Sequence, residues 1–160
     1  MLYSIEYASP VGRLTLAGSE THLTGLWIDG QKYFGRGAGE VLVPVKEYPL
    51  LDQARRWLDR YFDGKRPSPE ELPLSPHGSP FRQRVWEALC KIPYGQTLTY
   101  GELAQALGTA PRALGNAVGH NPISIIIPCH RVIGAGGSLT GYAGGIEVKR
   151  KLLLHEGIGL

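Results

Sequence analysis

The chain has 160 residues, enough for one ordinary domain or two small ones. With 42% hydrophobic residues, 19% charged residues and a net charge of +3, its composition is that of a globular protein and excludes a disordered or fibrous chain. No apolar run approaches the ~18–20 residues of a membrane span, and the first residues lack the pattern of a secretion signal. We therefore expect a protein of the cytosol or nucleus, with the cytoplasm as the predicted location, and no membrane partner.

Residues 1–30 alternate apolar and polar side chains with a period of two, most clearly through Tyr3, Ile5 and Tyr7. Turn-forming residues stand at positions 9–12 and 29–30. This pattern predicts a small antiparallel sheet. Residues 31–47 have no clear period, which predicts a loop or an irregular extra strand.

Apolar side chains then recur at helical spacing from Leu50 to Tyr61, which predicts a helix that ends at Asp63-Gly64. Five prolines follow between residues 65 and 80, where neither a helix nor an inner strand is expected. We therefore divide the chain into an α/β domain at 1–64, a proline-rich linker at 65–78 and a second domain at 79–160.

The second domain is expected to be mainly helical. A helix of about three turns is predicted from Ser79. A capping box of Thr99 and Glu102 starts another helix that ends at Gly108, and Pro111 opens one that closes before residue 121. Two short helices joined by a tight turn are typical of a helix-turn-helix, although many helix pairs in ordinary cores show the same pattern.

The helix that Pro111 opens exposes mainly small residues, Ala113, Gly115, Asn116 and Gly119, with Arg112 in its first turn. A cation there opposes the helix dipole. Small residues let a helix approach a grooved partner closely, and Arg112 could then insert, but a solvated surface explains the pattern equally well. Residues 81–160 hold 8 basic and 4 acidic side chains, which fits either a polyanionic partner or a surface that is simply basic.

Residues 123–127 are a run of mostly isoleucine that predicts a buried strand, and the run ends at Pro128-Cys129-His130. A glycine-rich stretch at 134–145 follows, where only a loop or a short hairpin is expected. The last predicted element is a helix at 147–156 that stops at Gly157. A thiol at the exit of the strand would be held on rigid backbone.

Cys129 is the candidate nucleophile. A free cysteine has a pKa of roughly 8.5 and reacts as the thiolate, so it needs a base or a cation nearby. His130 is the candidate base, and because successive residues of an extended chain point to opposite faces, we expect a water to link the two. Glu156 or His155 would orient the imidazole. A buried structural thiol is the alternative interpretation of Cys129.

Cys90 lies beside Trp86 at the border of an apolar stripe and is expected to be a small buried thiol. Two cysteines cannot build a disulfide framework, and Cys129 and His130 are adjacent, not at metal-ligand spacing. We therefore expect no disulfide, no metal and no cofactor.

The segment Ile127-Pro-Cys-His-Arg-Val132 carries a resemblance to a known family. Together with Asn121-Pro122, Gly141-Tyr-Ala-Gly-Gly145 and Leu154-His-Glu-Gly157, it strongly resembles the O6-alkylguanine-DNA alkyltransferases, also called methylated-DNA-protein-cysteine methyltransferases. The resemblance covers residues 79–157 in order, and the layout of the first half is similar. The turn between the two short helices is about one or two residues shorter than in many relatives, and Ala143 stands where some members have serine.

This resemblance implies the fold and the roles of individual residues. The fold would be α/β, with a small N-terminal antiparallel sheet and a helix, and a mainly helical C-terminal domain that carries a helix-turn-helix, or winged-helix-like, DNA-binding motif. The implied catalytic residues are Cys129 as alkyl acceptor, His130 as water-linked base, Glu156 as orienting acid, Asn121 as brace of the turn, and Tyr100 beside the target phosphate and the guanine oxygen. The implied DNA-binding residues are Arg112, Ala113, Gly115 and Tyr100, and the implied pocket residues are Val118, Val132, Tyr142, Ala143 and Gly144.

The implied function is DNA repair by direct reversal of damage. The protein would flip O6-alkylguanine, with O4-alkylthymine left open, out of double-stranded DNA and transfer the alkyl group irreversibly to Cys129, acting once as a monomer without a cofactor. Two alternatives remain: an alkyltransferase-like protein that flags lesions without repairing them, and a cysteine hydrolase that turns over. The first class lacks the acceptor cysteine, and the second needs a histidine in direct contact with the thiol and an oxyanion hole.

Overall fold

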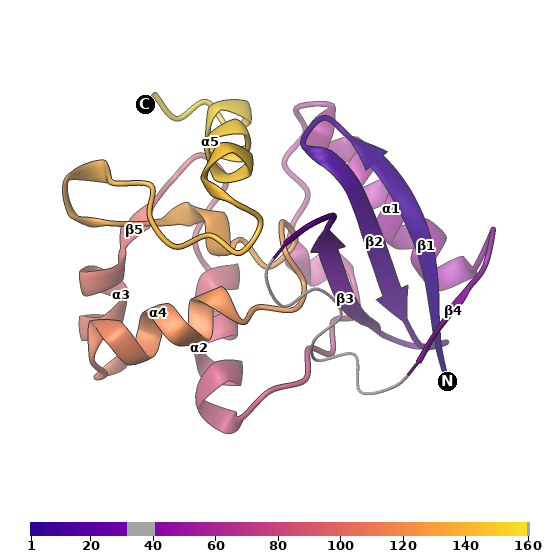
Figure 1. The fold of residues 1–160 in the computed structure, drawn as a ribbon, viewed down its shortest axis with the longest axis horizontal. Helices are drawn as coiled ribbons and strands as arrows, with labels where there is room; N and C mark the ends of the chain where they lie inside the picture. The colour runs from indigo at the N-terminus through magenta and orange to yellow at the C-terminus, as the bar shows by residue number, and fades with distance from the viewer. Residues whose placement is uncertain (32–40, 160) are drawn as a thin grey trace.

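The structure, a computed structural model, describes residues 1–31 and 41–159. A four-stranded sheet forms one side of the molecule and a group of helices forms the other (Figure 1). The strand order is β3-β2-β1-β4, where β1 is Leu2–Ser9, β2 is Gly12–Gly18, β3 is Leu23–Ile28 and β4 is Leu42–Pro44. The first three strands pair antiparallel, as the alternating pattern predicted.

Strand β4 makes the sheet mixed, because it pairs parallel with β1. For residues 31–47 the sequence allowed either a loop or an irregular extra strand, and β4 is that strand. Residues 32–40, which this prediction also covered, lie outside the described residues. A strand of three residues carries almost no periodic signal of its own. Its place in the sheet depends on its partner β1.

Helix α1 (Pro49–Phe62) covers one face of the sheet (Figure 1), and it ends at Asp63 as predicted. Its buried face consists of Leu50, Leu51, Ala54, Trp57, Leu58 and Tyr61. All six residues of β3 are buried, because α1 contacts this strand and the linker and the C-terminal half bridge to its open edge at Leu23 and Leu26. Buried residues of both halves form one continuous hydrophobic core. The division into domains at 64 and 79 therefore stays a prediction.

The proline-rich linker packs against the sheet. Its residues 69–71 (Pro69–Glu71) form a short 3₁₀ helix, η1. The prediction that residues 65–80 contain no helix is wrong here, because a proline is well suited to the first position of a helix. Farther along, Leu23 of β3 donates to the carbonyl of Pro73 and accepts from the amide of Ser75, both at 2.8 Å. These bonds hold the linker along the edge of β3.

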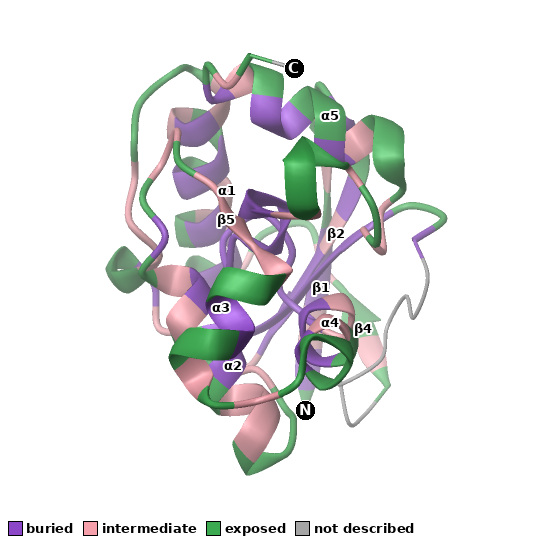
Figure 2. Ribbon diagram, turned by 90° about the vertical axis from the view of Figure 1, so that its left-hand side faces the viewer, coloured by how far each residue is buried: buried purple, intermediate pink, exposed green. Residues whose placement is uncertain are grey.

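The C-terminal half contains α2 (Pro80–Cys90), α3 (Tyr100–Leu107), α4 (Pro111–Gly119) and α5 (Ile146–His155). Strands β5 (Leu98–Thr99) and β6 (Val132–Ile133) form a small parallel pair, and η2 (Cys129–Arg131) and η3 (Ala135–Gly137) are 3₁₀ turns. Helices α3 and α4 turn an exposed surface outward and a buried surface to the core (Figure 2). Across residues 1–31 and 41–159, the structure contains no helix with the length and apolarity that a membrane crossing requires.

The helix ends follow the predicted caps. The Ser79 side chain accepts from the amide of Arg82, and Thr99 and Glu102 make both bonds of a capping box. Gly108 ends α3 in the left-handed conformation, with φ of 65°. Each of these contacts joins residues at most three or four positions apart, which is why the sequence predicted them.

The predicted strand at 123–127 is wrong. The segment turns back on itself, with one isolated bridge between Ile123 and Leu26. Ile125 has a φ of 71°, which is strained for a β-branched residue. The run of isoleucines indicated burial correctly, but burial alone does not distinguish a strand from another buried segment.

Candidate active site

Cys129 lies at the end of this strained turn, where its amide donates to the carbonyl of Ile127 at 2.8 Å. Its side chain is buried, with 5% of the residue exposed. The buried Asn121 holds the turn: its Nδ2 donates to Ile127 O at 2.8 Å, and its Oδ1 accepts from the amide of Ile123 at 3.0 Å. The Asn121 side chain thus makes hydrogen bonds to the backbone of the turn that, in a strand, a neighbouring strand would make.

The N-terminal sheet supports the same turn from the other side. The amide of Leu26 in β3 donates to Pro122 O at 2.8 Å, and the amide of Ser124 donates to Leu26 O at 3.0 Å. Gly144 approaches the end of β3 so closely that a Cβ there would lie 2.7 Å from Ile28. The N-terminal half therefore contributes directly to the position of the thiol.

Behind Cys129, His130 and Glu156 form a buried pair, with 2.6 Å between Nε2 and Oε2. The carboxylate also accepts from the Tyr61 hydroxyl at 2.6 Å, from the amide of Gly95 at 3.0 Å, and from two nitrogens of Arg131 at 2.8 and 3.1 Å. All of these partners are donors, so the site is built for an ionised carboxylate.

The sequence left Glu156 and His155 open as the group that orients His130. The structure favours Glu156, because the Nε2 of His155 lies 2.7 Å from the carbonyl of Tyr61. Since an ionised carboxylate can only accept, Nε2 of His130 carries the hydrogen and Nδ1 is the basic nitrogen of the neutral ring. Within the described part of the chain, Nδ1 is buried and has no hydrogen-bond partner.

Burial governs the charge of the three groups. It raises the pKa of the Cys129 thiol, although Asn121, Lys149 and two backbone amides oppose the rise. It lowers the pKa of His130, although Glu156 opposes the fall. Burial also favours a neutral Glu156, but the hydrogen bonds from His130 and Arg131 and the positive charge of Arg131 outweigh it and hold the pKa of this carboxyl well below its usual range. At rest the thiol and imidazole are therefore neutral and the carboxylate is charged.

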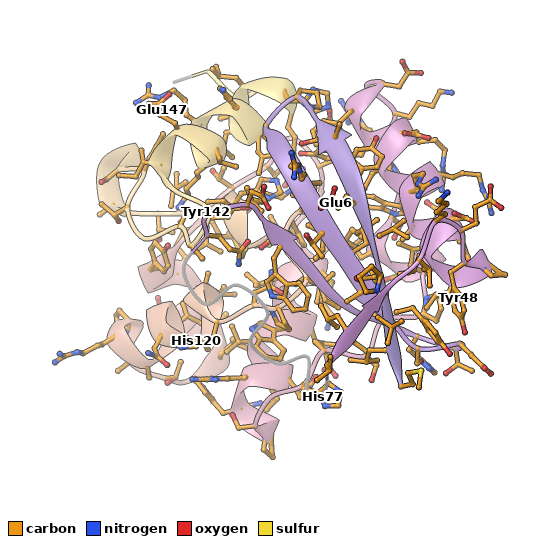
Figure 3. The ribbon with its side chains drawn as sticks, turned by 45° about the vertical axis from the view of Figure 1, so that its right-hand side comes forward. Glu6, Tyr48, His77, His120, Tyr142 and Glu147 are labelled. Carbon is orange, nitrogen blue, oxygen red and sulfur yellow. The ribbon has the colours of Figure 1, made fainter. Side chains whose placement is uncertain are left out.

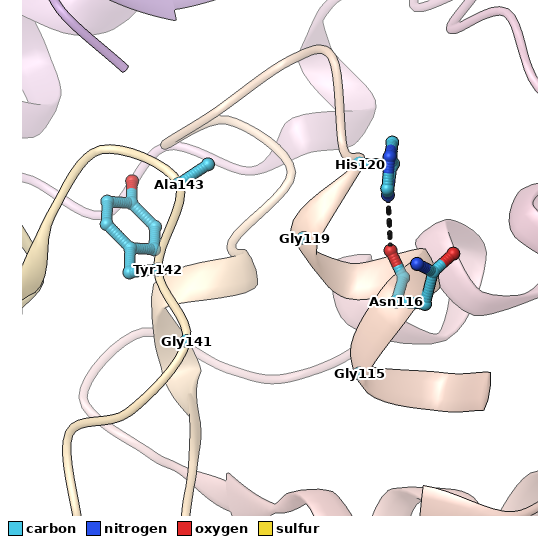
Figure 4. Close-up of a pocket in the computed structure, with 7 residues that line it drawn as sticks. All are labelled: Gly115, Asn116, Gly119, His120, Gly141, Tyr142 and Ala143. Carbon is cyan, nitrogen blue, oxygen red and sulfur yellow. Dashed lines mark hydrogen bonds between the residues drawn. The ribbon is translucent and has the colours of Figure 1, made fainter. Parts of the chain in front are cut away.

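A hollow of about 300 Å³ lies between α4 and the glycine-rich loop (Figure 4). It is lined by Gly115, Asn116, Gly119, His120, Gly141, Tyr142 and Ala143. The ring of His120 is held by the Asn116 carbonyl, 2.7 Å from its Nδ1. His120 and Tyr142 lie on the side of the molecule away from Tyr48 (Figure 3). The glycines on both walls keep the hollow open, since no side chain extends from those positions.

The structure brings together only some of the expected pocket residues. Tyr142 and Ala143 line the hollow, whereas Val118 and Val132 are buried in the core and Gly144 packs on β3. Of the expected DNA-binding residues, Arg112 and Ala113 are exposed on α4, Gly115 lines the hollow, and Tyr100 is half-buried with its hydroxyl donating to Thr140 O at 3.1 Å. Cys129 is not among the lining residues.

Sequence reasoning missed Lys149, which is buried completely on the inner face of α5. Its ammonium donates to Thr140 O at 3.0 Å and lies 5.6 Å from the centre of the Tyr100 ring. The sequence did contain a signal for its burial: Lys149 stands three residues before the inward-facing Leu152, so both lie on the same face of the helix.

The second cysteine differs from Cys129. Cys90 is half-buried on α2, and burial raises its pKa to about 11. The acidic side chains of Glu70 and Glu87 add to this rise. Almost no thiolate forms there at neutral pH, so Cys90 is a poor nucleophile.

Comparisons with known proteins match both halves of the chain. Residues 80–158 match the family model "6-O-methylguanine DNA methyltransferase, DNA binding domain", and residues 1–76 match "6-O-methylguanine DNA methyltransferase, ribonuclease-like domain". A methylated-DNA–protein-cysteine methyltransferase of Methanosarcina acetivorans is 45% identical over 164 residues, covering 98% of this chain and 99% of the relative. One of Mycobacterium tuberculosis (strain H37Rv) is 48% identical over 150 residues, covering 92% and 88%.

The fold has a solved counterpart. The crystal structure of Mycobacterium tuberculosis OGT in complex with DNA matches with a TM-score of 0.85 and 45% sequence identity, covering 96% of this chain and 92% of that one.

Proposed function

This chain belongs to the O6-methylguanine DNA methyltransferase family, and on that premise we propose that it repairs DNA by moving an alkyl group from O6 of guanine to the thiol of its own Cys129. The observation that carries the proposal is the arrangement around that thiol. Cys129 stands on a braced turn, next to a neutral His130 whose Nδ1 has no hydrogen-bond partner in the described chain and whose Nε2 is held by Glu156.

The proton of Cys129 passes to Nδ1 of His130 through a water. The resulting imidazolium is stabilised by the Glu156 carboxylate, 2.6 Å away. The thiolate attacks the alkyl carbon in line, so that the S–C bond forms as the bond from carbon to O6 breaks. Tyr100 donates a hydrogen bond to the departing guanine and stabilises its developing negative charge.

The product is a thioether. Unlike a thioester, it has no carbonyl that water can attack, so each molecule acts once. A cysteine hydrolase would need direct contact between thiol and imidazole and would turn over.

DNA is engaged through α4, whose outward face is exposed (Figure 2). Arg112 and Ala113 are exposed residues of this helix. The small residues of this helix allow it to enter the minor groove without reading a sequence. The alkylated nucleotide rotates out of the stack into the hollow beside Tyr142, Arg112 fills the space that it leaves, and the amide of Ala143 faces the guanine oxygen. O4-alkylthymine is a second candidate substrate, and we propose that the protein works as a monomer in the cytoplasm.

The decisive experiment uses duplex DNA with a radiolabelled O6-methyl group. The label should move to the protein, reach a ceiling of one per chain, and lie on the peptide that contains Cys129. Labelled methanol released over many turnovers would instead indicate a hydrolase. Tight binding with all label left on DNA would indicate a protein that only flags lesions.

Arg112→Ala should slow repair of duplex DNA much more than the reaction with free O6-benzylguanine, because only the duplex has a gap to fill. Rates on both substrates, measured by loss of active protein, provide the comparison. Arg13→Ala, which removes an exposed arginine of the sheet, is the matched control and should change neither rate. Equal losses on both substrates for Arg112→Ala would place this side chain inside the pocket instead.

Alkylation should lower the stability of the protein. Cys129 is 5% exposed, so an added group overpacks its surroundings, which typically costs about 1–3 kcal/mol. At roughly 2–4 °C per kcal/mol for a chain of this length, the melting temperature should fall by several degrees, and further for benzyl than for methyl. Melting curves before and after stoichiometric reaction test this, and an unchanged midpoint for the benzylated protein would refute the overpacking argument.

A further inference from the structure

Tyr61 of α1 reaches from the N-terminal half into the hydrogen-bond network behind Cys129. Its hydroxyl donates to Oε2 of Glu156 at 2.6 Å, across 95 positions of the sequence. Its backbone carbonyl lies 2.7 Å from Nε2 of His155, the residue before Glu156. One residue of α1 therefore holds the end of α5 at two adjacent positions.

The Tyr61 ring is fixed in place. None of its surface is exposed. The ring packs against those of Trp57, Phe62, Tyr94 and His155, with centroids 5.0 to 5.9 Å away. Burial and the charge of Glu156 raise the pKa of Tyr61 far above its usual value, so the hydroxyl keeps its proton and remains a donor.

The oxygen that Tyr61 binds is the one that His130 uses. Oε2 of Glu156 accepts from the Tyr61 hydroxyl and from Nε2 of His130, both at 2.6 Å, and from Nη2 of Arg131 at 3.1 Å. Oε1 instead accepts from the amide of Gly95 and from Nε of Arg131. Each donor draws electron density from the oxygen that it binds, so the hydrogen bond from Tyr61 weakens the one from His130.

We propose that Tyr61 is a positioning residue for the proton transfer: its hydroxyl holds Glu156 as an ionised carboxylate and limits the charge that Oε2 presents to His130, which keeps His130 neutral until it takes the proton of Cys129. This inference rests on the proposed function, in which His130 is the base. The thiol proton passes to Nδ1 of His130 through a water, and Tyr61 keeps its own proton throughout. The N-terminal half thus takes part in the chemistry through a fully buried residue.

Two opposing effects set the protonation of His130, and Tyr61 acts on one of them. Burial lowers the pKa of His130, whereas Glu156 raises it. Without the Tyr61 hydroxyl, more of the charge on Oε2 would face the ring. A nearby negative charge favours the imidazolium, so the pKa of His130 should rise. A histidine that is protonated at rest has no lone pair on Nδ1 and cannot accept the thiol proton.

The other titratable and charged groups around this pair act differently. They belong to η2, to the segment before β5 and to α5, and they are Cys129, Arg131, Tyr94, Lys149 and His155. Arg131 is ion-paired with Glu156, and the charge of Lys149 lowers the pKa of His130. Tyr94 donates to the carbonyl of His155 at 3.3 Å and not to the carboxylate. All of them are retained in Tyr61→Phe, so this variant isolates the effect of one hydroxyl.

The test compares Tyr61→Phe with Tyr94→Phe by NMR of the His130 ring. The first variant keeps the packed ring and removes the hydroxyl on Oε2, and the second removes the hydroxyl of the neighbouring phenol and is the matched control. In Tyr61→Phe the Nε2 proton of His130 should move downfield, because its bond to Oε2 becomes stronger. The midpoint of the ring titration should rise by about 0.5–1 pH unit, the equivalent of one ordinary hydrogen bond. Tyr94→Phe should change neither. An Nε2 proton that stays in place or moves upfield in Tyr61→Phe would overturn the proposal.

The reaction provides a second readout. On the acid side of its pH profile, the rate with O6-benzylguanine should fall at a pH about 0.5–1 unit higher in Tyr61→Phe than in the natural protein or Tyr94→Phe. If Tyr61 only stabilised the fold, the variant would melt at a lower temperature with this limb unchanged, which would contradict the inference. The NMR readout needs neither DNA nor an alkyl donor. Failure of label transfer from alkylated DNA would thus reject the proposed function, while the His130 resonance would still decide the role of Tyr61.

Discussion

Cys129→Ala is expected to abolish alkyl transfer completely while leaving the affinity for DNA unchanged. The substitution removes the sulfur atom that would accept the group. Cys90, the other thiol of the described residues, is a poor nucleophile because burial raises its pKa to about 11. Cys129 is buried, so it makes no contact with phosphates, and alanine leaves only a small cavity. Label transfer from O6-methylguanine DNA and binding of the same duplex, measured in parallel, separate the two effects.

Cys90→Ala is the matched control, since it removes the other free thiol of the described chain. Its pKa of about 11 makes it a poor nucleophile, so transfer should be essentially intact. Label that still reaches the Cys129→Ala protein, or label on Cys90, would show that the acceptor is assigned to the wrong residue.

Glu156→Gln should cause the largest loss of stability of any single substitution in the site. This carboxylate accepts hydrogen bonds from Tyr61, Gly95, His130 and Arg131. The NH2 group of a glutamine would face some of these donors and could not accept from them. It would also leave the Arg131 guanidinium buried without its counter-charge, which typically costs about 3–5 kcal/mol. Urea unfolding measures the loss. Glu147→Gln, on the exposed side of α5, should change stability by less than about 0.5 kcal/mol.

The same substitution should slow alkyl transfer, because it removes the charge that stabilises protonated His130. General base catalysis contributes about 10²–10⁴-fold, and we expect a loss of about 10- to 100-fold from weakening it. The rate with O6-benzylguanine, at a temperature where the variant is folded, gives this number. A variant that is less stable but fully active would mean that Glu156 supports the fold and not the proton transfer.

The pH dependence of the unfolding free energy should also show that Glu156 is ionised in the folded protein. Its pKa in the folded protein lies below the value of 4.5 that holds for an unperturbed glutamate, so its contribution to stability is complete above that value and is lost as the pH falls toward the folded pKa. The unfolding free energy of the natural protein should therefore fall more steeply below about pH 5 than that of Glu156→Gln. Parallel slopes for the two proteins would contradict the ionised pair.

Much of this protein was readable from its sequence because the interactions involved are short-range. The cap at Thr99 and Glu102, the stop at Gly108 and the buried face of α1 depend on residues within one or two helical turns. The alternating pattern of residues 1–30 likewise determines β1, β2 and β3. The sequence also named Cys129 and His130 as candidate nucleophile and base, since the two are neighbours in the chain, and these roles stay predictions.

The tertiary structure alone decided the rest, because it depends on contacts between residues far apart in the sequence. The apolar run at 123–127 forms a strained turn and not a strand, since Asn121 and Leu26 take up its backbone groups. Glu156 and not His155 holds His130, because Tyr61, 95 positions away from Glu156, and Arg131 converge on that carboxylate. The burial of Lys149 beside Thr140 and Tyr100 is likewise visible only in the tertiary structure. Periodicity reports which face of a helix is buried, but the partner that a buried charge meets there is set by the packing of the whole chain.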